Sequence, residues 1–139
     1  MIAILTDLPP ASTLVKADGS LARPDNAHNN NAFVRKAVLE EKRPQHMAWA
    51  RERPDGGRGF GFTGGHNHWN WGHNQFRKLM LNAIAWSAHV DVPKEGVPSR
   101  SLKVEDLVAN QDYSVPDNFN PARIQAMLDQ WNRKSASKN

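Results

Sequence analysis

The feature that most constrains this chain is a stretch of glycine, aromatic residues and histidine between residues 57 and 74. Phe60 and Phe62 alternate with glycines, which predicts a strand with one bulky face and one nearly bare face. Gly64 and Gly65 follow, and because glycine adopts backbone angles that a Cβ resists, we expect a tight turn there. The window then holds half of the six histidines of the chain. We therefore expect a functional site of this chain to lie here.

A β-hairpin is predicted to include this strand. Met47 and Trp49 alternate with alanines, which is typical of a strand, and an Asp-Gly pair at 55–56 separates that run from the phenylalanine strand. An Asp-Gly turn between two alternating runs is a strong hairpin signal. We therefore expect residues 46–52 to pair with residues 58–63 as antiparallel neighbours.

A helix is predicted to follow the histidine-rich loop, from a cap at Asn74 to about Ala88. Residues at helical spacing along it form one largely apolar stripe, made of Phe76, Leu79, Met80, Ala83, Ile84 and Ser87. Leucine, alanine and tryptophan broaden the stripe. We expect a well-buried helix with Arg77 and Lys78 on its exposed side.

The remaining elements are shorter. Residues 1–5 are expected to form a short buried strand, and residues 33–42 either a short helix or an extended segment. A helical turn is expected at 104–108. A second helix is predicted at about 121–133, because Pro121 suits the first turn of a helix and apolar residues then follow at helical spacing.

The composition excludes some classes of site and partner. With no cysteine, the chain has no disulfide, thiolate nucleophile or cysteine-type zinc site. The formal net charge is +4, but the basic residues are scattered and interleaved with acids. A nucleic-acid-binding protein concentrates them in a patch, so we expect no nucleic-acid partner. No apolar run is long enough to span a bilayer and the N-terminus does not resemble a signal peptide, so we expect no membrane partner and leave the compartment open.

The motifs resemble those of one family. Residues 58–66 read RGFGFTGGH and residues 76–88 read FRKLMLNAIAWSA. In this order they resemble the strand and the helix near the C-terminus of ThuA-like (trehalose utilisation) domains, and residues 47–51, MAWAR, resemble the strand that precedes them in that family. The likeness covers residues 45–92 well and residues 1–44 loosely.

The resemblance implies a three-layer α/β fold, flavodoxin-like and similar to class I glutamine amidotransferases. Such a domain is longer than what precedes His66 here, so the N-terminal half of the sheet is expected to be missing. Residues 1–92 would be the C-terminal portion of the domain. Residues 93–139 would be a C-terminal extension that contains the helix at about 121–133.

His66 is the candidate catalytic residue. It follows the phenylalanine strand at a glycine turn, and open sheets bind ligands beyond the C-terminal ends of their strands. An imidazole titrates near neutral pH, so His66 could act as a general base or bind a ligand. The alternative is a structural histidine that is hydrogen-bonded to a neighbouring loop.

A metal site is a weaker hypothesis. His66, His68 and His73 follow an H-x-H pattern with a third histidine five residues on, and three histidines with a water are a known zinc set. No carboxylate lies in the loop, and His73 could simply precede the helix cap. We therefore assign no metal, keep these three as weak candidates, and leave the cofactor unknown.

The other residues of the loop are candidate ligand-binding residues. Aromatic side chains beside amides suit a sugar, because the ring stacks on the apolar face while the amides bond to the hydroxyls. One of the two tryptophans is expected to belong to the core instead. The candidate set is Gly65, Asn67, His68, Trp69, Trp71 and Asn74.

The implied function is a role in the utilisation of a trehalose-type sugar, with a carbohydrate as the expected partner. The alternatives are a non-catalytic sugar-binding or interaction module and an inert fragment. Converging histidines would favour an enzyme, and scattered histidines would favour the alternatives. Half a sheet leaves an uncovered edge, so we also expect marginal stability and either self-association or pairing with the missing half.

Overall fold

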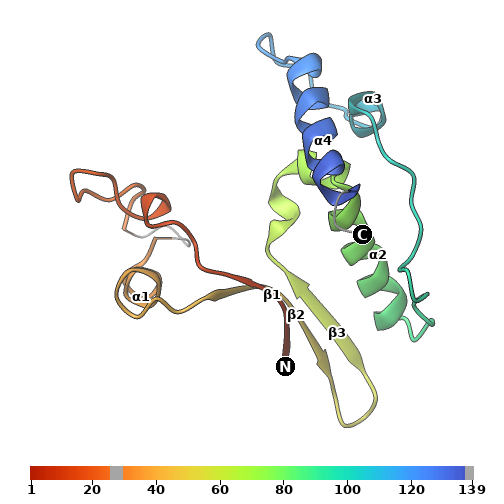
Figure 1. Ribbon diagram of the computed structural model, residues 1–139, viewed down its shortest axis with the longest axis horizontal. Helices are drawn as coiled ribbons and strands as arrows, with labels where there is room; N and C mark the ends of the chain where they lie inside the picture. Colours follow the sequence, from red (N-terminus) through yellow and green to blue (C-terminus); the bar gives the residue numbers. More distant parts are fainter. Residues whose placement is uncertain (26–29, 137–139) are drawn as a thin grey trace. The chain divides into compact units, whose positions relative to one another are not determined.

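The computed structural model describes residues 1–25 and 30–136, and it is a mixed α/β structure with a three-stranded antiparallel sheet (Figure 1). The chain divides into two compact units. The first contains residues 1–52 and 60–63, and the second contains residues 53–59 and the described residues from 64 onward. The expected boundary between residues 92 and 93 lies inside the second unit.

The sheet contains β1 (Ile2–Asp7), β2 (Gln45–Glu52) and β3 (Arg58–Phe62), in the order β1-β2-β3. The predicted hairpin is confirmed, since β2 and β3 are neighbours within one residue of the expected bounds. Among the described residues the sheet has three strands. The finer flavodoxin-like architecture would need strands and covering layers that these residues do not supply.

The hairpin turn follows from its sequence. The Arg53 backbone N–H donates to the Gly57 carbonyl at 2.8 Å, which closes a three-residue loop. The last residue of that loop, Gly56, has a φ of +82°, a left-handed conformation that favours glycine. Asp55 Oδ1 accepts the Gly57 N–H at 3.0 Å and the Arg53 Nε–H at 3.1 Å. These bonds lower the pKa of the Asp55 carboxyl, the backbone bond from Gly57 more than the bond from Arg53.

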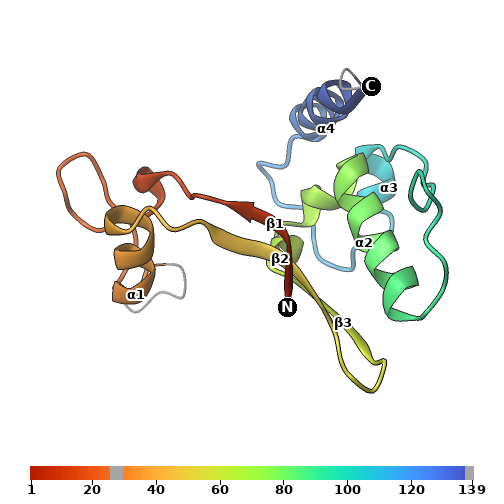
Figure 2. The same ribbon diagram turned by 60° about the horizontal axis from the view of Figure 1, so that its bottom comes forward.

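The expected N-terminal strand is present, but the prediction that it is buried is wrong. β1 pairs antiparallel with β2, with Ile2 opposite Ala50 and Asp7 opposite Gln45, and Figure 2 shows it lying along β2. All six residues of β1 are nevertheless exposed. As an edge strand, β1 has a neighbour on one side only, whereas Ala48 and Ala50 of the central strand are buried.

The small core of the first unit includes Leu14, Ala37 and Val38, each at most 3% exposed. Residues 33–42, for which either a helix or an extended segment was expected, are largely helical. They belong to α1 (Ala32–Arg35), which continues as the π-helical turn η2 (Lys36–Glu40).

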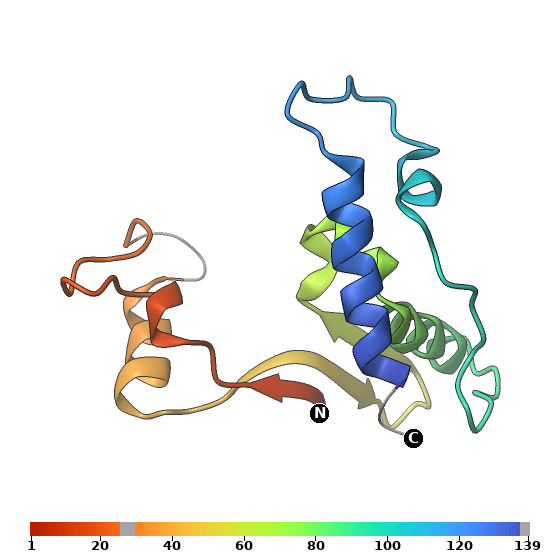
Figure 3. The ribbon, with the colours of Figure 1, turned by 45° about the horizontal axis from the view of Figure 1, so that its top comes forward.

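The second unit is built on α2 (Asn74–Ser87), α3 (Val104–Val108) and α4 (Pro121–Ala136). All three predicted helical segments are confirmed. Figure 3 shows α4 running beside the short 3-10 helix η4 (His68–Gly72) and the start of α2. No helix of the described residues is long and apolar enough to cross a membrane.

The contact between α4 and η4 depends on Gly72. Leu128 of α4 is fully buried, and a Cβ built at Gly72 would lie only 2.4 Å from its Cδ2. Asn132, one turn further along α4, also holds this junction. Its Oδ1 accepts the Asn74 backbone N–H at 2.9 Å, and its Nδ2 donates to the Gly72 carbonyl at 3.1 Å. The absence of a side chain at Gly72 therefore lets α4 approach.

Two expectations about α2 are wrong. Arg77 is not on an exposed side, since it is only 8% exposed. Its guanidinium donates to the carbonyls of Trp71 and Arg100 and to Asn74 Oδ1, so it stabilises the chain around the start of the helix. Nor is the helix well buried as a whole, because Ile84 of the expected stripe is 63% exposed.

Candidate functional site

The histidine-rich loop is mostly regular structure. The short 3-10 helix η3 (Gly64–His66) is followed by Asn67 and then by η4. Asn67 begins η4 by accepting the Trp69 backbone N–H on its Oδ1 at 3.2 Å. Asn70 donates from Nδ2 to the Gly64 carbonyl at 2.9 Å, which holds the two turns together. The expected order of strand, turn, loop and helix is therefore present.

His66 and Gly65 are both exposed, on η3. Gly65 has open space around the position of a Cβ, with no atom within 4 Å. The turn therefore leaves room for a ligand, and the role of His66 as a general base stays a prediction.

His68 has a fixed environment. Its Nε2 lies 2.7 Å from the Leu107 carbonyl oxygen at the end of α3, and because a carbonyl only accepts, Nε2 carries the proton. The ring packs edge-on against Trp69, with centroids 5.2 Å apart. His68 therefore connects η4 to α3 and presents its ring beside an indole.

His73, and not Asn74, is the N-cap of α2, which corrects the expected start of the helix. Its Nδ1 accepts the backbone N–H groups of Gln75 and Phe76 at 3.2 and 3.4 Å. Burial lowers the pKa of the His73 imidazole, and the positive charge of Arg77 lowers it further. The partial positive charge at the start of the helix likewise disfavours a protonated imidazole at His73.

The histidines do not form a metal set. Among residues 1–25 and 30–136, no group of three histidine or acidic side chains could hold a metal ion. His68 bonds to α3, His73 caps α2, and His66 is exposed on η3. The three histidines therefore have separate environments in this structure.

The two tryptophans have different environments. Trp71 packs edge-on against Phe76 of α2, with centroids 5.0 Å apart. Trp69 instead stacks on Phe119, with centroids 5.8 Å apart and planes inclined by 21°, and it lines an open groove. Both side chains are half-buried, so the expectation that one of the two belongs to the core does not separate them, and Trp69 is the one that lines the groove.

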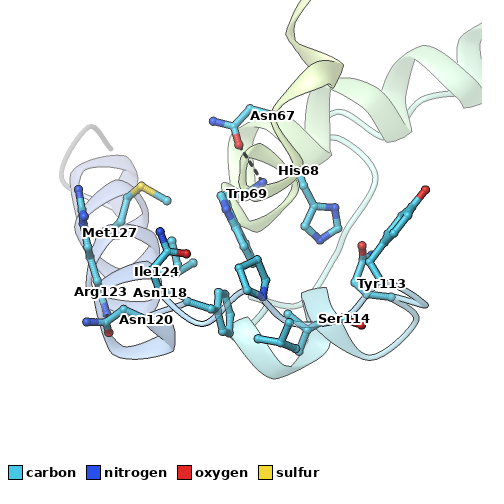
Figure 4. A pocket seen from close by; sticks show the side chains of 15 residues that line it. Asn67, His68, Trp69, Tyr113, Ser114, Asn118, Asn120, Arg123, Ile124 and Met127 are labelled. Atoms are coloured by element: carbon cyan, nitrogen blue, oxygen red, sulfur yellow. Dashed lines mark hydrogen bonds between the residues drawn. The ribbon is translucent and has the colours of Figure 1, made fainter.

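The groove beside Trp69, here called the Trp69 groove, has a volume of about 850 Å³. Three of the candidate residues line it: Asn67, His68 and Trp69. Its other walls are the end of α3, the connecting segment 111–120 and the first turns of α4. In the view of Figure 4, Trp69 and His68 extend from their turn toward the segment that carries Tyr113 and Ser114.

The lining combines aromatic, amide and apolar groups. The aromatic rings are Trp69, Phe119 and Tyr113, and Tyr113 is 83% exposed. Four amide side chains surround them, those of Asn67, Gln111, Asn118 and Asn120. Aliphatic side chains of α4 and of the connecting segment complete the apolar surface.

Asn74 and Trp71 are not among the lining residues. The Asn74 side chain donates to Ser101 Oγ at 2.8 Å and accepts from Arg77 Nη2 at 2.8 Å, so its amide is used inside the second unit. It stabilises the start of α2, and a ligand would compete with these bonds.

The contribution of the C-terminal region was missed from the sequence. Phe119, Asn118 and Arg123 lie about fifty residues beyond the histidine-rich loop, in a region expected to be an extension. One signal was available: Tyr113, the only tyrosine of the chain, and Phe119 occur in an otherwise polar segment that is not helical. Aromatic residues in such a segment are typical of a binding loop.

Comparison with protein-family models, with curated proteins and with solved structures found no match to this chain.

Proposed function

We propose that this chain is the C-terminal part of a ThuA-like domain and that it binds a carbohydrate in the Trp69 groove. The family assignment rests on the motifs at residues 47–51, 58–66 and 76–88. The binding role rests on one observation above all: Trp69, stacked on Phe119, lies among four amide side chains. In the complete domain the sheet would continue into the three-layer α/β fold.

The groove suits a sugar in both size and chemistry. Small-molecule sites typically enclose roughly 300–1,000 Å³ and combine apolar or aromatic walls with a few polar groups that fix orientation. At about 850 Å³ the Trp69 groove lies within this range. A pyranose ring presents C–H groups that stack on an indole, while its hydroxyls exchange hydrogen bonds with amides, which both donate and accept.

The same lining favours binding without hydrolysis. Glycosidases commonly use a pair of carboxylates on either side of the bond that breaks. None of the lining residues, all within the described part of the chain, is an aspartate or a glutamate. We therefore favour the sugar-binding module, and we keep His66 as the candidate general base should the complete domain be an enzyme.

The test is binding of trehalose and maltose to the chain, measured by isothermal titration calorimetry and saturation-transfer NMR. We expect Trp69→Ala to weaken binding by roughly tenfold, since an aromatic contact contributes about 1 kcal/mol beyond the area that it buries. Asn118→Ala should weaken it less, because one hydrogen bond is lost.

Trp71→Ala is the matched control. Trp71 packs on Phe76 and does not line the groove, so its loss should lower the melting temperature but leave the affinity of the folded protein unchanged. Failure of the unaltered chain to bind either sugar, or equal affinity in the Trp69 variant, would overturn the proposal.

A further inference from the structure

The lining of the Trp69 groove carries charge of one sign only, and that sign is positive. Among its lining residues Arg123 is the single arginine, lysine, aspartate or glutamate. Every other polar group that lines the groove is an amide, a hydroxyl, an imidazole or an indole N–H. The groove therefore carries a formal positive charge with no carboxylate to balance it.

Arg123 lines the groove from the first turn of α4. The helix begins at Pro121, and Asn120 Oδ1 accepts the Arg123 backbone N–H at 3.0 Å. Ile124 and Met127 of the same helix also line the groove. The backbone at Arg123 is therefore fixed, while its side chain is exposed and can meet a ligand.

The acidic residues near the groove either bond to other side chains or do not line the groove. Asp106 of α3 pairs with Arg100, with Nη2 and Oδ1 2.6 Å apart, and Asp129 of α4 accepts from Gln125 Nε2 at 2.9 Å. Asp112 and Asp117 each lie between two lining residues but do not themselves line the groove. Among the described residues, no ion pair involves Arg123. Its guanidinium is thus available to an anion from solution.

We infer that the groove takes an acidic sugar, a ring that carries a carboxylate or a phosphate, with the anion bound by Arg123. This inference rests on the proposed carbohydrate-binding function and adds the class of ligand. A guanidinium suits either anion because its planar donors match two oxygens at once. The neutral part of the ring would lie toward Trp69 and the amides.

The test compares three probes that share one ring and differ only at C6: glucose, glucuronate and glucose 6-phosphate. Affinities are measured by calorimetry or NMR titration with the complete chain at low salt. We expect both acidic sugars to bind roughly five- to tenfold more tightly than glucose, because hydrogen bonds to charged groups are stronger than those between neutral groups. The difference should shrink in 0.5 M NaCl, where exposed charges are screened.

Arg123→Gln should remove this preference, so that both acidic sugars bind the variant no more tightly than glucose does. The matched control is Arg133→Gln, an exposed arginine on the same helix that does not line the groove, and it should keep the preference. A stronger effect with only one of the two acids would identify which anion the site takes.

The outcomes separate the two proposals. Binding of glucose with no gain for either acid, or a preference that survives Arg123→Gln, overturns the acidic-sugar inference and leaves the sugar-binding function standing. No binding of any of the three probes, together with no binding of trehalose or maltose, overturns the proposed function itself.

Discussion

The indole of Trp49 lies directly against the backbone of Gly61. A Cβ built at Gly61 would come within 2.3 Å of Trp49 Cε2 and within 2.4 Å of Cζ2. The nearly bare face of the phenylalanine strand is therefore covered at Gly61 by an aromatic side chain from the neighbouring strand, while Gly59 has open space around it. The glycine at this position is needed for packing, since any larger residue would displace the ring.

Gly61→Ala should therefore destabilise the hairpin. Forcing a methyl group into a contact this short displaces the indole and typically costs about 1–3 kcal/mol. The control is Gly59→Ala on the same strand, where no atom lies within 4 Å of the new methyl group. Urea denaturation followed by tryptophan fluorescence measures both, and equal midpoints for the two variants would refute the packing argument.

Gly72→Ala should loosen α4 in the same way. Its methyl group would lie 2.4 Å from Leu128 Cδ2 and 3.2 Å from Leu107 Cδ1, so both α3 and α4 would have to shift. We expect faster amide hydrogen exchange along α4 and a loss of about 1–3 kcal/mol. Gly65→Ala, with open space around it, is the control. Unchanged protection of α4 in the Gly72 variant would show that the helix is held without this contact.

The edge strand β1 should promote self-association. Ile2, Ile4 and Leu5 are 65%, 47% and 42% exposed on a strand with one free edge. Unprotected apolar edge strands tend to pair with a second copy. Sedimentation velocity at increasing concentration should show growth of the sedimentation coefficient, and Ile4→Lys should suppress it because charges block edge pairing. A concentration-independent monomer for the unaltered chain would contradict this prediction.

Local sequence patterns predicted where the strands and helices of this chain lie, but they did not predict which residues are buried. The alternation in β2 and β3, the Asp-Gly turn and Pro121 each determine a nearby backbone conformation, and each element appears where expected. Burial depends on partners distant in sequence, which explains why β1 is exposed and Arg77 is buried against expectation. For the same reason the sequence indicated only the wall of the groove that the histidine-rich loop forms. The wall from Tyr113 to Met127 was missed.

The last prediction concerns the pH dependence of stability through His73. Its Nδ1 accepts two backbone N–H groups at the start of α2, so the cap requires that nitrogen to be unprotonated. Burial, and then the charge of Arg77, lower the pKa of His73 below its ordinary value of 6.5. The unfolded chain therefore binds this proton more readily than the folded chain. The contribution of the cap is fully present above pH 6.5 and is lost as the pH falls through that value toward the lower pKa of the folded state.

We therefore expect the melting temperature to fall between pH 7.5 and pH 5, as measured by circular dichroism. His73→Asn should flatten this part of the curve, because an asparagine caps a helix without titrating, whereas His73→Ala should cost about 1 kcal/mol at pH 7.5 through loss of the cap. His66→Asn replaces an exposed histidine on η3 and should leave the slope as it is. The same pH slope in the His73→Asn variant and in the unaltered chain would mean that another group controls the transition.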